Sequence, residues 1–69
     1  MIAVTTLHGK NFYINPDLIY RIEETPDTTI TLIDSKTLVV KEAPEVVVHR
    51  IISYRQTIYR QVPQINKNQ

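Results

Sequence analysis

The first 41 residues alternate between short β-branched segments and turn-forming clusters, and this alternation constrains the fold more than any other feature. The segments cover residues 2–6, 11–14, 18–24, 29–33 and 37–41, and they are rich in Val, Ile, Thr and Tyr. Their length and composition are typical of strands rather than helices. Because short turns join neighbouring strands in antiparallel order, the pattern predicts a five-stranded antiparallel meander.

Each connection contains residues that suit a reversal of the chain. Gly9, the single glycine, lies where a hairpin turn needs a positive φ angle. Residues 15–17 and 25–28 each combine proline, which has no N–H to donate, with side chains that hydrogen-bond to nearby backbone. Residues 34–36 form a weaker turn signal. The strongest of these signals therefore predict a first hairpin over residues 2–14 and a turn before each of the next two strands.

The second half of the chain predicts one helix. Pro44 and Glu45 suit a first helical turn, and the proline at 63 disfavours helix in the residue before it, so the helix should end near residue 61 or 62. Apolar residues recur at 47, 51, 54 and 58, beside a second stripe at 48, 52 and 59. The β-branched residues here also favour strand, so a strand from Val46 to His49 is the alternative.

Together these elements predict a small α+β domain over residues 1–62 and a flexible tail over residues 63–69. A C-terminal amphipathic helix would pack on one face of the meander. The candidate core residues are Ile2, Val4, Phe12, Ile14, Tyr20, Ile22, Ile30, Leu32, Val39, Val47, Ile51, Tyr54 and Ile58. A chain this short buries only about 60% of its unfolded surface, and several strands are apolar on both faces. We therefore expect a homo-oligomer, a dimer or higher, or a partner that covers the remainder.

The composition argues against most chemical sites. Without cysteine there is no disulfide framework or thiolate metal site, and one glycine cannot build a phosphate-binding loop. His8 and His49 have no ligand spacing, and Ser35 and Ser53 lack an orienting acid beside a histidine. We therefore expect no enzyme activity, metal or cofactor. No apolar run approaches the roughly 20 residues of a membrane span, so we expect a cytoplasmic protein.

Charge is divided unevenly along the chain. Residues 1–42 hold six acidic and four basic side chains, net −2, whereas residues 43–69 hold four basic and one acidic, net +3. Three arginines are spaced five residues apart along the predicted helix: Arg50, Arg55 and Arg60. Each therefore points about 140° away, around the helix axis, from the one before it. They therefore spread around the helix instead of forming one phosphate-binding stripe. With Tyr59 they form the candidate interaction surface, and nucleic acid is not the expected partner.

The order of these motifs resembles a known family. Residues 7–19 (LHGKNFYINPDLI), 22–28 (IEETPDT) and 30–32 (ITL) are similar to the FlbD family of small flagellar proteins, called SwrD in swarming bacteria. The resemblance continues to about residue 60 through VVKE, EVV and RIISYR. It implies a cytoplasmic protein that supports flagellar motility, with a motor or basal-body protein as partner and no assigned site residues. Relatives often have a glycine in the turn after Leu32, where this chain reads IDSK.

A shorter resemblance implies a different function. Residues 42–50 (EAPEVVVHR) are similar to a stretch of the carbon storage regulator family, which consists of small RNA-binding dimers with five strands and a C-terminal helix. The N-terminal pattern of that family is absent here. The alternative function is therefore a dimeric RNA-binding post-transcriptional regulator, and this alternative would place a strand at residues 46–49.

Overall fold

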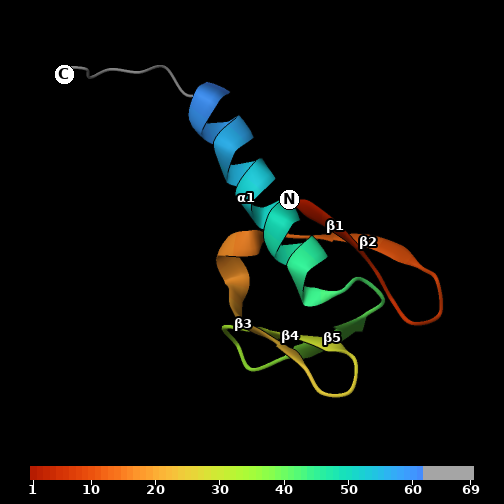
Figure 1. Cartoon of the computed structure of the whole chain (residues 1–69). Helices are drawn as coiled ribbons and strands as arrows, with labels where there is room; N and C mark the ends of the chain where they lie inside the picture. The colour runs from red at the N-terminus through yellow and green to blue at the C-terminus, as the bar shows by residue number, and fades with distance from the viewer. Residues whose placement is uncertain (62–69) are drawn as a thin grey trace.

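A computed structural model describes residues 1–61 of the chain, and its side chains up to Tyr59. The elements in chain order are β1 (Ile2–Thr5), β2 (Asn11–Ile14), the 3₁₀ turn η1 (Pro16–Leu18), β3 (Ile19–Glu24), β4 (Thr28–Leu32), β5 (Thr37–Val40) and α1 (Pro44–Gln61). Five antiparallel strands and one C-terminal helix confirm the predicted α+β class (Figure 1). The predicted domain end at residue 62 and the predicted tail over residues 63–69 lie outside the described residues.

The strands form two sheets instead of one continuous sheet. β1 and β2 make a hairpin, while β3, β4 and β5 make a three-stranded antiparallel sheet in sequence order. A bridge between Thr6 and Val40 links the two sheets, and the Lys41 N–H donates to the Thr5 carbonyl at 2.8 Å. The end of β1 therefore lies beside the end of β5, although the paired residues are 34 and 36 positions apart in sequence.

The turn η1 explains why β3 does not continue the first hairpin. The Asn15 side chain accepts a hydrogen bond from the Asp17 N–H at 2.9 Å, and Pro16, which is buried, begins the turn. The chain is thereby redirected, and β3 pairs with β4 rather than with β2. Proline and the locally bonding side chain of Asn15 produce this change of direction, as the sequence indicated, whereas the Asp17 carboxylate bonds to the distant Arg55.

Among residues 1–61, two adopt a positive φ angle, both in tight turns. Gly9 has a φ of 91° in the loop between β1 and β2, which confirms the reason for a glycine there. Ser35 has a φ of 75° between β4 and β5. The Asp34 carboxylate supports this second turn by accepting from the Lys36 N–H at 3.1 Å. A serine thus occupies a left-handed position that a glycine would adopt with less strain.

The core lies where both sheets meet α1. Its buried side chains are Ile2, Val4, Ile30, Val40 and Val47. Half-buried side chains pack around them: Phe12, Ile14, Ile19, Ile22, Leu32, Leu38, Ile51 and Tyr54. This set confirms most of the predicted core. Because only five apolar side chains of the described residues form the buried cluster, contacts outside the core matter for the stability of this domain.

The predicted inward orientation is wrong for Tyr20 and Val39. Tyr20 is 68% exposed because the pairing of β3 with β4 shifts register between Ile19 and Arg21. This irregularity places Ile19, rather than Tyr20, in the core. Val39 is 39% exposed because its strand presents the neighbouring residues, Leu38 and Val40, to the core.

The helix α1 begins at Pro44, so a strand over residues 46–49 is wrong. The Ala43 carbonyl accepts from the N–H groups of Val46 and Val47, at 2.9 and 3.2 Å, and these bonds start the helix. Tertiary packing of Val47 overrides the strand preference of the local sequence. The C-terminal half of α1 extends beyond the strands in Figure 1. Ile58, a predicted core residue, is consequently 41% exposed.

Candidate functional site

A nearly buried carboxylate joins β1 to the start of α1. Glu42 follows β5, and its side chain is only 11% exposed. One oxygen, Oε1, accepts from the Thr5 N–H at 2.9 Å, and the other, Oε2, accepts from the Thr5 hydroxyl at 2.8 Å. Arg50 of α1 donates from Nη1 to the same Oε2 at 3.1 Å. Glu42 therefore ties β1, 37 positions earlier in the sequence, to the start of α1.

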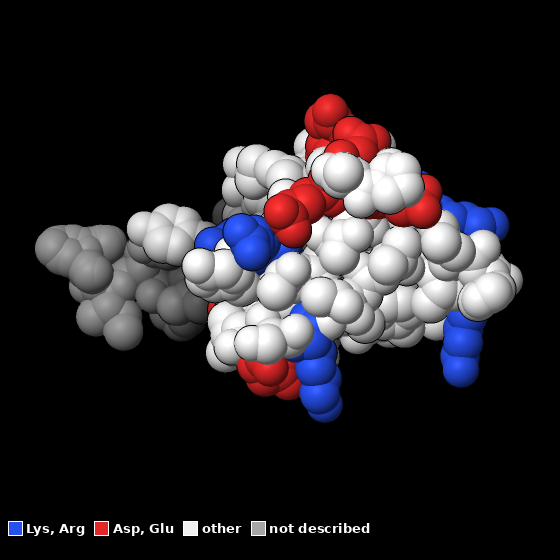
Figure 2. All heavy atoms as spheres, turned by 90° about the horizontal axis from the view of Figure 1, so that it is seen from below, with Lys and Arg blue, Asp and Glu red and all other residues white. Residues whose placement is uncertain are grey.

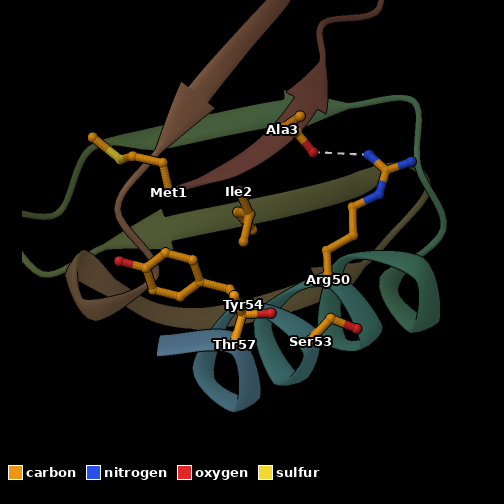
Figure 3. A pocket seen from close by; sticks show the side chains of 7 residues that line it. All are labelled: Met1, Ile2, Ala3, Arg50, Ser53, Tyr54 and Thr57. Atoms are coloured by element: carbon orange, nitrogen blue, oxygen red, sulfur yellow. Dashed lines mark hydrogen bonds between the residues drawn. The ribbon is translucent and has the colours of Figure 1, made fainter. Parts of the chain in front are cut away.

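Arg50 completes this network from the helix side. Its Nη1 also donates to the Ala3 carbonyl at 2.8 Å (Figure 3), while its side chain remains 41% exposed. A shallow hollow beside this contact is lined by Met1, Ile2, Ala3, Arg50, Ser53, Tyr54 and Thr57. The lining offers hydroxyl groups and one guanidinium but neither a carboxylate nor an imidazole. As it stands, the hollow offers no pair of groups for proton transfer near neutral pH.

The environment of Glu42 favours its charged form. Burial on its own would raise the pKa of this carboxyl, but the backbone and hydroxyl of Thr5, its own backbone N–H and the Arg50 guanidinium all donate to it. Together these donors lower the pKa of Glu42 below its ordinary value of 4.5. A carboxylate saturated in this way stabilises the fold and is poorly suited to accept a proton from a substrate.

A second ion pair connects α1 to η1. The Nη2 atom of Arg55 lies 3.2 Å from Oδ1 of Asp17, with the two side chains 59% and 73% exposed. An exposed pair of this kind contributes about 0.2–1 kcal/mol. Asp17 belongs to the motif at residues 15–19 on which the family resemblance partly rests. In this fold the motif forms a turn and places a carboxylate against the helix.

Two residues of the candidate interaction surface, Arg50 and Arg55, do not come together. Arg50 points toward β1, whereas Arg55 points toward η1. Tyr59 is 71% exposed, and the side chain of Arg60 lies outside the described residues. An interaction role for this set remains a prediction, but Arg50 and Arg55 already bind carboxylates within the molecule.

An exposed apolar stripe runs along the opposite side of α1. We call Val48, Ile52 and Tyr59 the outer stripe; their side chains are 44%, 50% and 71% exposed. One shallow hollow beside it is lined by Pro44, Glu45, Val48, His49 and Ile52, and a second by Ile52, Arg55, Gln56 and Tyr59. The two hollows share Ile52, so the outer stripe is one continuous surface about three turns long.

The outer stripe was visible in the sequence, but its exposure was not. Its spacing is helical, and it adjoins the stripe that includes Val47 and Ile51. Pattern alone assigned both stripes to one broad apolar face. The two small sheets cover only the first of them, which leaves the second as surface.

Charged groups on the rest of the surface do not form a basic groove on the face that Figure 2 shows. There, Lys and Arg side chains project singly or lie beside Asp and Glu, and uncharged surface separates them. Both histidines, His8 and His49, are exposed. Within residues 1–61, no three His, Cys, Asp or Glu side chains gather as metal ligands would. No helix in that range is long and apolar enough to cross a membrane.

A comparison with protein families relates this structure to known proteins. The FlbD family model, described as flagellar and swarming motility proteins, matches residues 1–59. The chain belongs to the FlbD family. The FlbD match includes every strand, the Glu42 network and the whole outer stripe, and it ends at Tyr59. No curated protein and no solved structure matches the chain.

Proposed function

We propose that this FlbD-family protein is a non-enzymatic accessory protein that supports flagellar motility and swarming through protein–protein contact. The observation that carries the proposal is the family match over residues 1–59. The protein would act in the cytoplasm, at the motor or the basal body. The outer stripe is the surface that we assign to this contact, because exposed apolar stripes on small domains commonly mark binding sites.

The state of the polar groups supports binding rather than chemistry. Glu42, the best-shielded carboxylate described above, has both oxygens occupied by hydrogen bonds, and its lowered pKa opposes proton transfer at neutral pH. Arg50 is held by the same network. These groups hold β1 and α1 together, so the outer stripe remains the better candidate for function.

The alternative function, RNA-binding regulation, has less support in the fold. Its resemblance rests on residues 42–50, and the part from Pro44 onward forms helix instead of the strand that this alternative would place there. Two of the arginines available to phosphates, Arg50 and Arg55, are paired with Glu42 and Asp17. Phosphate binding would have to compete with both pairs.

The test is complementation of a deletion strain with matched variants. Deletion should reduce swimming or swarming while the flagellin level stays unchanged. Wild-type protein should restore motility, and Ile52→Glu should not. Ile33→Glu is the matched control, because Ile33 is likewise an exposed isoleucine, 64% exposed, but lies outside α1 in the turn between β4 and β5. Unchanged motility after deletion would contradict the proposal. Salt-dependent binding of a messenger leader RNA, weakened by Arg50→Ala, would support the alternative.

A further inference from the structure

The outer stripe has an arrangement that a second copy of the same surface can complement. Ile52 lies at its centre, and one shallow hollow extends from it toward Pro44 and the other toward Tyr59. A two-fold axis at Ile52 would place the first hollow of one helix over the second hollow of its mate. A surface paired with itself in this way forms an isologous interface, the commonest kind in soluble homodimers.

We propose that the outer stripe is a homodimer interface in which two α1 helices pack antiparallel about Ile52. In this register each Ile52 packs against its mate. A two-fold axis at Ile52 pairs residues that are equally far before and after position 52. Each Val48 therefore lies opposite Gln56 of the other copy. The buried stripe that includes Val47 and Ile51 stays on its own sheets.

The charges on α1 favour antiparallel over parallel packing. Glu45 lies in the first turn, and Arg55 lies in the C-terminal half. Antiparallel packing places Glu45 opposite Tyr59 and Arg55 opposite His49 of the other copy, so like charges stay apart, and it aligns the helix dipoles favourably. Parallel packing would instead place Arg55 beside Arg55 and Glu45 beside Glu45.

The length of the stripe limits the strength of the dimer. From Val48 to Tyr59 the helix rises roughly 16 Å, which is short for an interface. Stable complexes usually bury about 1,200–2,000 Å² in total, and a single helix pair of this length lies at or below that range. We therefore expect a dissociation constant in the micromolar range, roughly 10–100 μM.

This inference rests on the proposed function in one respect, since both assign the outer stripe to protein contact. It adds the identity of the occupant, a second copy of this chain. If substitutions in the stripe abolish motility although the wild-type protein never dimerises, the dimer is overturned and the proposed function stands. If the protein dimerises through the stripe but such substitutions leave motility unchanged, the dimer stands and the proposed function is overturned.

Cysteine cross-linking tests the register directly, because the natural chain has no cysteine. Three single-cysteine variants are made, Ile52→Cys, Val48→Cys and Gln56→Cys, and are oxidised at about 100 μM, the upper end of the expected dissociation constant. The control is Tyr13→Cys, because Tyr13 is 72% exposed on β2, away from α1. Circular dichroism and thermal melting confirm that each reduced variant is folded before oxidation.

The antiparallel dimer predicts a distinct pattern of products. Ile52→Cys should cross-link to itself efficiently, and a mixture of Val48→Cys with Gln56→Cys should give mainly the mixed disulfide. Val48→Cys alone should cross-link no faster than Tyr13→Cys, because its mate lies about 12 Å away along the axis. Rapid self-cross-linking of Val48→Cys would show parallel packing, and equal slow rates for all variants would show that the stripe does not self-associate. Either result overturns the proposal.

Discussion

The two sides of α1 differ in the chemistry of the groups that they present. On the side of α1 that faces β1, Arg50 forms a hydrogen-bonded network with three residues outside the helix, Glu42, Thr5 and Ala3. We call these four residues the anchored side. On the other side, the outer stripe leaves apolar groups of Val48, Ile52 and Tyr59 at the surface. The contrast indicates that one side of the helix maintains the fold, while the other is available for contact.

This division follows from the size of the domain. The core cluster has five buried apolar side chains and is small. A hydrogen-bonded carboxylate that joins residues 37 positions apart therefore adds substantially to stability. The same small sheets cannot cover a helix of 18 residues on more than one side. Substitutions on the anchored side should therefore reduce stability, and substitutions on the outer stripe should reduce association.

The largest effect is expected on the anchored side. Glu42→Ala removes the acceptor of the Thr5 N–H, one of two acceptors near the Thr5 hydroxyl, and one of the two acceptors of Arg50, which keeps its bond to the Ala3 carbonyl. Losing the partner of a buried or partly buried group costs about 1–3 kcal/mol, and we expect about 2–3 kcal/mol here because three donors are affected. Urea unfolding measures this loss. The control is Glu45→Ala on an exposed first-turn carboxylate, which should cost under about 1 kcal/mol. Equal losses for the two variants would contradict a special role for Glu42.

The anchored side should also make stability depend on pH. The pKa of Glu42 is lower in the folded protein than its ordinary value of 4.5, so the unfolded chain binds the proton first as the pH falls. The stabilisation is complete well above pH 4.5 and is lost as the pH falls through the folded pKa. Glu42→Gln removes this dependence, so its deficit in unfolding free energy relative to wild type should be larger at pH 7 than at pH 3. A deficit that is the same at both pH values would exclude this mechanism.

A substitution outside both the anchored side and the outer stripe should raise the free energy of unfolding without altering association. Ser35 holds a φ of 75° between β4 and β5, and a left-handed conformation costs a non-glycine residue about 1–2 kcal/mol. Ser35→Gly removes this strain but makes the unfolded chain more flexible, so we expect a net gain of roughly 0.5–1 kcal/mol. Thermal melting and urea unfolding would measure the gain. The matched substitution Ser53→Gly within α1 should instead destabilise the protein, because glycine is a poor helix former.

The smallest effect is expected for the exposed ion pair near the outer stripe. Asp17→Ala removes the partner of Arg55, and because both side chains are more than half exposed the loss should be about 0.2–1 kcal/mol, decreasing in high salt. Urea unfolding in low and high salt measures it. A loss as large as that of Glu42→Ala would contradict the distinction between the two sides.

The elements of this fold could be predicted more fully than the orientation of its side chains. Gly9, the proline turns and the start of the helix at Pro44 all rest on local backbone chemistry, which the sequence displays directly. The inward orientation failed at Tyr20 because apolar residues occupy both faces near the start of β3. An irregularity in strand pairing therefore decides which of them is buried.

The candidate site could be predicted only in part. The spacing of residues 48, 52 and 59 was clear, but its exposure depends on how much of the helix the sheets cover. The bond from Thr5 to Glu42 has no local signal, since tertiary folding brings together residues that are 37 positions apart. The uneven charge was visible in the sequence but specified no ion pair, and the structure pairs Arg50 with Glu42 and Arg55 with Asp17.

The division between the two sides of α1 is tested most directly by sedimentation of Ile52→Glu beside wild type and Ile33→Glu, from roughly 5 to 500 μM, a range that brackets the expected dissociation constant. Wild type and Ile33→Glu should shift from monomer toward dimer across this range. Ile52→Glu should remain a monomer with an unchanged unfolding free energy measured at the lowest concentration. Dimerisation of Ile52→Glu equal to that of wild type, or wild-type protein that stays monomeric throughout, would contradict the account.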